Sequence, residues 1–153
     1  MLYDIIIIGG GPAGCAAAVY TARKRLKTLL ITEEFGGQSL VSDDIQNWIG
    51  EAHISGFDLA KKFEAHVAAF SEMVEVKMPE RVIEVSEKGN NFSVTTQSGA
   101  VYETKAVILT AGARRRKLGV PGEEKFNGKG VAYCSTCDAP LFSGRTVGVV
   151  GGG

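Results

Sequence analysis

Residues 2–14 read LYDIIIIGGGPAG, and they carry the clearest structural signal in the N-terminal part of the chain. The β-branched run from Leu2 to Ile8 has no helical period, which is typical of a strand covered on both faces of a parallel sheet. Pro12 then begins a helix, because proline at the first helical position loses no needed hydrogen bond. Small residues at 13–22 allow close packing on the sheet, and residues 27–32 form the next strand. The stretch therefore predicts a right-handed βαβ unit.

The glycines of this unit have the spacing Gly9-x-Gly11-x-x-Gly14 between a strand and a helix, as dinucleotide-binding turns do. Gly9 permits the tight turn, Gly11 lets the backbone approach a pyrophosphate, and Gly14 lets the helix meet the strand. The helix N-terminus supplies N–H donors to the anion. At the end of the next strand, about 20 residues on, Glu33 is expected to accept a hydrogen bond from a ribose hydroxyl, with Glu34 as the alternative. A glycine-rich turn without a ligand is the other interpretation.

The segment that follows predicts a loop and then a helix. Residues 35–50 have no clear period and contain turn residues, which indicates a loop with at most a short helix at 42–47. Ser55-x-x-Asp58 resembles a capping box, and apolar residues follow it at helical spacing. We therefore expect an amphipathic helix at 56–71.

Short apolar runs separated by turn residues predict an antiparallel meander, with strands at 74–78, 81–86, 92–97 and 101–104. Residues 106–110 predict a further buried strand, and the composition changes to a linker near 112–122. The run TVGVVGGG at 146–153 predicts another strand with a glycine-rich turn. The fold class is therefore α/β: a doubly wound nucleotide-binding domain at 1–112, then a linker and the first part of a second such domain at 113–153.

Composition limits the partners and the compartment. Apolar residues make up 44% of the chain, and Lys+Arg and Asp+Glu both number 17, so no broad electric field attracts nucleic acid or acidic membranes. The apolar run at 5–8 is too short to span a membrane and follows no basic region. We expect a cytoplasmic protein with no nucleic-acid or membrane partner.

Cysteine usage favours chemistry over scaffolding. Three cysteines are too few for a secreted disulfide framework, whereas the spacing of Cys134 and Cys137 is typical of catalytic or metal sites. Zinc needs four ligands, and neither Cys15 nor the two histidines stand at a second such spacing, so no metal site is predicted. Two inert thiols are a further alternative. Asp138, beside Cys137, can exchange the protons that dithiol exchange requires.

Seven motifs follow one another along the chain. They are GGGPAG (9–14), FGGQ (35–38), IQNW (45–48), TAG (110–112), VPGE (120–123), CSTCD (134–138) and VVGGG (149–153). In order and spacing they resemble the low-molecular-weight thioredoxin reductases. The flavoprotein part of alkyl hydroperoxide reductase is almost as similar, through GVAY (130–133) and PLF (140–142). The resemblance covers the whole chain, although Ala-Thr-Gly is usual at 110–112 and members run to about twice this length.

The resemblance implies FAD in the first glycine-rich turn. The pyrophosphate is then expected at Gly11, Pro12 and Ala13, and the adenosine ribose at Glu33. Gln38 and Asn47 are expected near the flavin, with the 110–112 turn closing over the cofactor. The predicted cofactor-binding residues are Gly9, Gly11, Pro12, Ala13, Gly14, Glu33, Gly37, Gln38, Asn47, Val82, Thr110, Ala111 and Gly112.

The resemblance also implies a reaction. Cys137 would face the flavin, Cys134 would attack the protein substrate and Asp138 would act as acid–base. The implied enzyme is a homodimeric flavoprotein disulfide reductase that passes electrons from NAD(P)H through FAD to the Cys134–Cys137 disulfide, then to a thioredoxin-like or peroxiredoxin-linked protein. An FAD-dependent dithiol oxidase that uses oxygen is one alternative. A non-catalytic flavin-binding fragment is the other, because no helix follows the second glycine-rich turn to hold a nicotinamide nucleotide.

Overall fold

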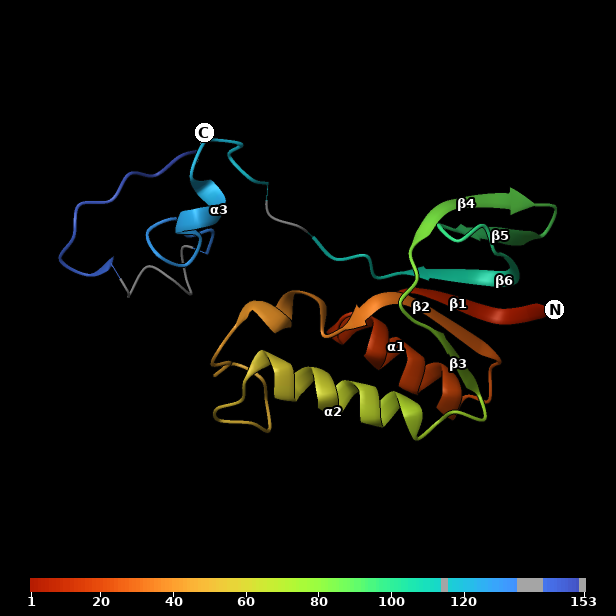
Figure 1. The fold of residues 1–153 in the computed structure, drawn as a ribbon. Coiled ribbons are helices and arrows are strands. Elements are labelled where there is room, and N and C mark those ends of the chain that lie inside the picture. The colour runs from red at the N-terminus through yellow and green to blue at the C-terminus, as the bar shows by residue number, and fades with distance from the viewer. Residues whose placement is uncertain (114–115, 135–141, 152–153) are drawn as a thin grey trace. The chain divides into compact units, whose positions relative to one another are not determined.

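The computed structural model describes residues 1–113, 116–134 and 142–151. The chain divides into two units, Met1–Ala113 and Arg114–Gly153, whose elements are drawn in Figure 1. The assignment of the two parts to an FAD-binding domain and the beginning of an NAD(P)H-binding domain stays a prediction. Within the described ranges, no helix has the length and apolar character needed to cross a membrane.

The first unit is built on one six-stranded sheet. Its strands are β1 (Leu2–Gly10), β2 (Thr28–Phe35), β3 (Val74–Lys77), β4 (Val82–Lys88), β5 (Asn91–Thr96) and β6 (Val101–Leu109), in the order β3-β2-β1-β6-β5-β4. Neighbours from β3 to β6 pair in parallel, and β6, β5 and β4 form an antiparallel meander. The predicted α/β class, with a parallel core and a meander, is confirmed.

Two helices cover one face of the parallel strands: α1 (Pro12–Arg23) and α2 (Gly56–Ala68). Ile7 and Leu30 of the sheet pack there against Ala18 of α1 and Val67 of α2. Small residues in α1 permit this close approach, as the sequence predicts. Ser55 caps α2, since its Oγ accepts a hydrogen bond from the backbone N–H of Asp58 at 3.0 Å, so the N-cap that the Ser55-x-x-Asp58 motif predicts is confirmed.

The opposite face of the parallel strands is covered by the meander (Figure 1). Because side chains alternate along a strand, Ile6, Leu29 and Ile31 point away from the helices and pack against Val94 of β5. Both faces of β1 and β2 are thus buried. This explains the near-continuous apolar character of the two strands.

Residues 42–47 form a loop, as expected, without the short helix that the sequence allowed there. A 3-10 helix, η1 (Gly37–Val41), lies earlier in the loop. The backbone groups of the 42–47 segment are instead used across the loop, where Ile45 and Ile54 exchange hydrogen bonds at 2.8 and 3.2 Å. Cross-loop pairing therefore replaces the helical bonds that the segment would otherwise need.

Two strand predictions need correction. The strand expected at 74–78 does not belong to the meander, because β3 pairs in parallel with β2 after the α2 crossover. A parallel neighbour is the usual result when a helix returns the chain to the same sheet. The runs at 101–104 and 106–110 form the single strand β6, which pairs with β5 and with β1.

The second unit contains one short helix, α3 (Glu123–Phe126), within its described residues. The strand predicted in the 146–150 run is absent there, and Val147, Val149 and Val150 are exposed. A strand exists only when neighbours satisfy its backbone groups. Within the described residues, none pairs with this run.

Candidate functional site

The carboxyl ends of three parallel strands bring most of the predicted cofactor residues to one edge of the sheet. Gly10 at the end of β1 pairs with Phe35 of β2, and Ile8 pairs with Leu109 of β6. The glycine-rich turn, Glu33 and Thr110 therefore lie at neighbouring strand ends. Open parallel sheets bind their ligands at this edge.

In the first turn, Gly9 and Gly14 are among the positions that are packed too tightly to carry a side chain. Gly9 has φ +110°, and a Cβ there would overlap the carbonyl oxygen of Thr110. A Cβ on Gly14 would overlap the carbonyl oxygen of Gly9, so α1 meets β1 directly. Thr110 fixes the turn from the other side, because its Oγ1 donates to the carbonyls of Ile8 and Gly9 at 2.8 and 3.0 Å.

Gly11 differs from these two glycines. Its backbone angles, φ −72° and ψ −177°, suit any residue, and a Cβ built on it meets no atom within 4 Å. The space beside Gly11 is therefore open. α1 begins at this point with Pro12 and without a side-chain cap, and Ala13 is exposed. Uncapped N–H groups and the positive end of the helix dipole beside open space fit an anion such as a pyrophosphate.

Of the remaining predicted contacts, Gly37 lies closest to the turn. A Cβ on Gly37 would stand 3.3 Å from the Cα of Gly11, and the neighbouring Gly36 N–H donates to the carbonyl of Gly10 at 2.9 Å. Gln38 and Asn47 are exposed on the loop that follows, and neither hydrogen-bonds to the turn within the described residues. Ala111 and Gly112 are exposed directly after Thr110.

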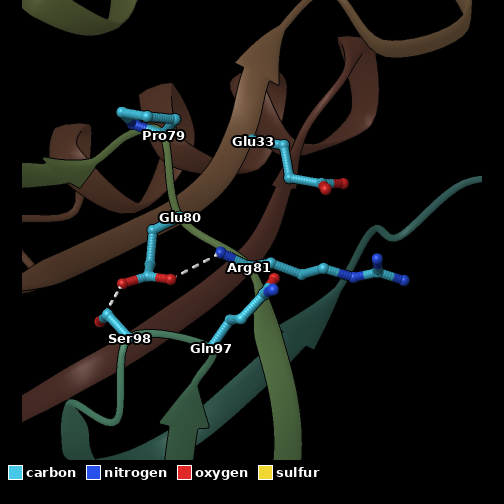
Figure 2. Close-up of a pocket in the computed structure, with 6 residues that line it drawn as sticks. All are labelled: Glu33, Pro79, Glu80, Arg81, Gln97 and Ser98. Carbon is cyan, nitrogen blue, oxygen red and sulfur yellow. Dashed lines mark hydrogen bonds between the residues drawn. The ribbon is translucent and has the colours of Figure 1, made fainter.

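A pocket of about 370 Å³ lies beside Glu33 (Figure 2). It is lined by Glu33, Pro79, Glu80, Arg81, Gln97 and Ser98. Glu34 is not among these residues, which favours Glu33 for the predicted ribose contact. Val82 is partly buried at the start of β4. It does not line the pocket itself but follows the lining residue Arg81 directly in sequence.

Hydrogen bonds between two turns form the wall of this pocket. The Glu80 carboxylate accepts from the Ser98 hydroxyl and from the Arg81 N–H, and these two bonds lower its pKa. Glu33 and Arg81 extend toward the same side of the pocket in Figure 2. A carboxylate there can accept bonds from hydroxyls, and a guanidinium can donate to an anion or stack on a ring.

Sequence reasoning missed Glu80, Arg81, Gln97 and Ser98. The available signal was the position of two turns, Pro79 after β3 and Gln97-Ser98-Gly99 after β5. These two turns meet because β4 and β5 pair, with Val82 opposite Thr96. Their approach to Glu33 depends on the pairing of β3 with β2, which no local pattern reveals.

The cysteines occupy different environments. Cys134 is partly buried in the second unit, and Cys137 and Asp138 lie outside the described residues. Cys15 is buried in α1, where its thiol donates to the carbonyl of Gly10 at 3.3 Å and burial raises its pKa to about 11. A thiol so held is a poor nucleophile. Among the described residues, no three His, Cys, Asp or Glu side chains gather as a metal site would require.

A family model described as "Pyridine nucleotide-disulphide oxidoreductase" matches residues 3–153. The match includes both glycine-rich turns and the Cys134-x-x-Cys137 motif. The chain belongs to the pyridine nucleotide-disulphide oxidoreductase family.

Three relatives align with 99% of this chain. The NADH dehydrogenase of Bacillus subtilis (strain 168) is 44% identical, one component of the alkyl hydroperoxide reductase of Escherichia coli (strain K12) 41%, and the thioredoxin reductase of Treponema pallidum (strain Nichols) 43%. The chain spans 29% of the first, 29% of the second and 48% of the third.

A similar solved structure is that of thioredoxin reductase from Streptococcus pyogenes MGAS5005, which is 42% identical with a TM-score of 0.79. The likeness covers 92% of this chain and 45% of that chain. The predicted resemblance to thioredoxin reductases and to the flavoprotein part of alkyl hydroperoxide reductase is thereby confirmed.

Proposed function

We propose that this chain forms part of a cytoplasmic flavoprotein disulfide reductase, which uses NAD(P)H and FAD to reduce a thioredoxin-like or peroxiredoxin-linked protein. The observation that carries the proposal is the family match over residues 3–153, which contain a nucleotide-type turn and a C-x-x-C pair in one chain. Bound FAD supplies the two-electron chemistry that links a nicotinamide nucleotide to a disulfide.

The first unit binds the cofactor in this proposal. Backbone N–H groups at the start of α1 hold the pyrophosphate in the open space beside Gly11. The Glu33 carboxylate accepts hydrogen bonds from the adenosine ribose, and the pocket that contains Arg81 and adjoins Val82 takes the adenosine end. The 110–112 turn and the exposed side chains of Gln38 and Asn47 are assigned to the flavin end.

The second unit carries the exchange reaction. The Cys134 thiolate attacks the substrate disulfide, which forms a mixed disulfide and releases one substrate sulfur as a thiolate. The Cys137 thiolate then attacks Cys134 Sγ, which releases the second substrate sulfur and closes the Cys134–Cys137 disulfide. The two electrons of the dithiol thus reach the substrate, and Asp138 supplies a proton to a departing thiolate.

The reaction is tested by NAD(P)H oxidation coupled to reduction of a thioredoxin-like protein and, separately, of a peroxiredoxin-linked one. Cys134→Ser in the complete protein should slow substrate reduction by at least about 1,000-fold, because a hydroxyl cannot replace the thiolate. Flavin reduction by the nucleotide should persist. Cys15→Ser is the matched control and should retain turnover, since serine can donate the same bond to Gly10. Substrate turnover in the Cys134→Ser variant would refute the assignment.

The cofactor site is tested at Gly11. Gly11→Ala should leave the fold intact, because the added methyl group meets no atom of the chain. It should weaken FAD binding about tenfold or more, since loss of one hydrogen bond to a charged group costs about 1.5–3 kcal/mol. Flavin absorbance per chain measures binding, and far-UV circular dichroism checks the fold. Full flavin content in this variant would count against a pyrophosphate beside Gly11.

A further inference from the structure

Glu123 is the only buried residue among the described residues of the second unit. Its exposed fraction is 4%, whereas Phe126 in the same helix is 49% exposed. Burial of a carboxylate is costly unless its oxygens accept hydrogen bonds. A carboxylate that is more buried than the apolar residues around it therefore has a specific structural role.

The partners of Glu123 come from both sides of α3. Its oxygens accept hydrogen bonds from the backbone N–H groups of Leu118 at 2.7 Å, Gly119 at 2.6 Å and Val120 at 3.4 Å. The same carboxylate accepts a hydrogen bond from the hydroxyl of Tyr133, and these bonds lower the pKa of Glu123. Bonds to an ionised acceptor are stronger than neutral ones. Glu123 thus joins the segment before α3 to a residue well beyond it.

The backbone between α3 and Tyr133 is also folded back. The carbonyl of Phe126 accepts hydrogen bonds from Lys129 at 2.8 Å and Val131 at 2.9 Å, and the Gly128 N–H donates to Val131 at 3.0 Å. Tyr133 is consequently held through this turn and through its own hydroxyl. Cys134 is the next residue, so the hydrogen bonds that hold Tyr133 also restrict the position of the first cysteine of the C-x-x-C segment.

We propose that Glu123 and Tyr133 form a clamp that positions Cys134 for disulfide exchange. This inference rests on the proposed function and deepens it. Exchange requires the attacking sulfur to meet its target in a narrow range of positions. Without the clamp, residue 134 samples more positions, so encounters with the substrate disulfide and with the second thiol both become less frequent.

Each partner in the clamp can be changed by a small substitution that leaves the size of its side chain nearly unaltered. Tyr133→Phe deletes only the hydroxyl and leaves the three backbone bonds of Glu123, so it carries little risk to folding. Glu123→Gln removes the charge. Two matched controls change the same groups elsewhere: Glu124→Gln alters the exposed neighbour that pairs with Lys117, and Tyr3→Phe removes the hydroxyl that donates to Glu75.

Two readouts separate positioning from a general loss of structure. In each clamp variant, kcat for protein-disulfide reduction should fall about three- to tenfold, which corresponds to one lost hydrogen bond, while flavin reduction by the nucleotide is unchanged. The equilibrium of the protein disulfide with glutathione should shift toward the dithiol by a similar factor, because the paired thiols have a lower effective concentration. The double variant should be no worse than the stronger single one.

Wild-type kcat and glutathione equilibrium in both clamp variants would overturn the clamp. An equal fall in kcat in Glu124→Gln or Tyr3→Phe would overturn it as well. Removal of any carboxylate or hydroxyl would then lower kcat, whether or not it belongs to the clamp. Cys134→Ser separates failure of the clamp from failure of the proposed function. This variant would retain turnover of the protein substrate only if the proposed function were wrong.

Discussion

Different interactions stabilise the interior of each of the two units. Every buried apolar residue in the described ranges lies between Tyr3 and Val94, in the first unit. The second unit buries a single described residue, the charged Glu123, and leaves Leu118 and Val120 half exposed. The first unit therefore rests on apolar area spread over a sheet and two helices, whereas the described part of the second rests on a local polar clamp. We expect that truncation of a buried side chain in the first unit lowers the free energy of unfolding. A substitution in the second unit should instead change only the positions of the residues around Glu123.

The largest effect is expected from Leu30→Ala in β2. Leu30 is fully buried between the sheet and the helices, so its truncation leaves a cavity and should lower the free energy of unfolding by about 2–5 kcal/mol. Leu118→Ala is the control. Leu118 is 46% exposed and bonds to Glu123 through its backbone, so we expect a change within about 0.5 kcal/mol.

Urea unfolding followed by far-UV circular dichroism measures both variants. Similar losses of stability at the two leucines would contradict this difference between the units, because the second unit would then contribute an apolar core of its own. A loss confined to Leu30→Ala would support it.

A smaller effect is expected where the first unit uses a polar contact of the same type. Ser55 Oγ accepts the Asp58 N–H at the start of α2, as Glu123 accepts backbone N–H groups beside α3. Ser55→Ala should lower the free energy of unfolding by about 1 kcal/mol, the usual value for loss of an N-cap.

The exposed Ser71, beyond the end of α2, provides a matched serine for this test. Ser71→Ala should leave the urea midpoint unchanged. If Ser55→Ala instead unfolded the protein, α2 would depend on its cap more than on the burial of Leu59 and Val67. That result would contradict the statement that apolar burial stabilises the first unit.

Sequence reasoning succeeded where the physics is local. The β1 turn, the α1 start at Pro12 and the Ser55 cap each depend on residues a few positions apart, so composition and spacing were sufficient. It failed where partners are distant. The 74–77 run carries the same signal whether it pairs in the meander or beside β2, and the 146–150 run has strand composition without a described neighbour. The Glu33 pocket was missed for the same reason, because it needs β3 beside β2. The Glu123 clamp was missed although its partners are close in sequence, because no spacing pattern marks a carboxylate that turns inward to accept backbone N–H groups.

The smallest effect is expected from acid, and it compares two tyrosine–carboxylate pairs. Tyr3 of β1 donates to Glu75 of β3 at 2.6 Å in the first unit, and Tyr133 donates to Glu123 in the second. The pKa of Glu75 is lowered by its bonds to Lys77 and Tyr3, and that of Glu123 by its bonds to Tyr133 and to backbone N–H groups. Each carboxylate thus contributes stability that is present above its ordinary pKa of 4.5 and is lost as the pH falls through its lowered value.

The consequences of protonation should differ between the units. Around Glu75, the parallel pairing of β3 with β2 remains when the carboxylate is neutralised, so the amide signals of those strands should shift little. Around Glu123, the proton neutralises the carboxylate whose two oxygens accept from Leu118 and Gly119 and so weakens both bonds, and their amide signals should titrate together below pH 4.5. An NMR titration measures both groups, and Glu123→Gln should abolish the titration at Leu118 and Gly119 alone. If the β3 amides moved as far as those two, apolar burial would not be what holds the first unit in place, and the contrast between the units would fail.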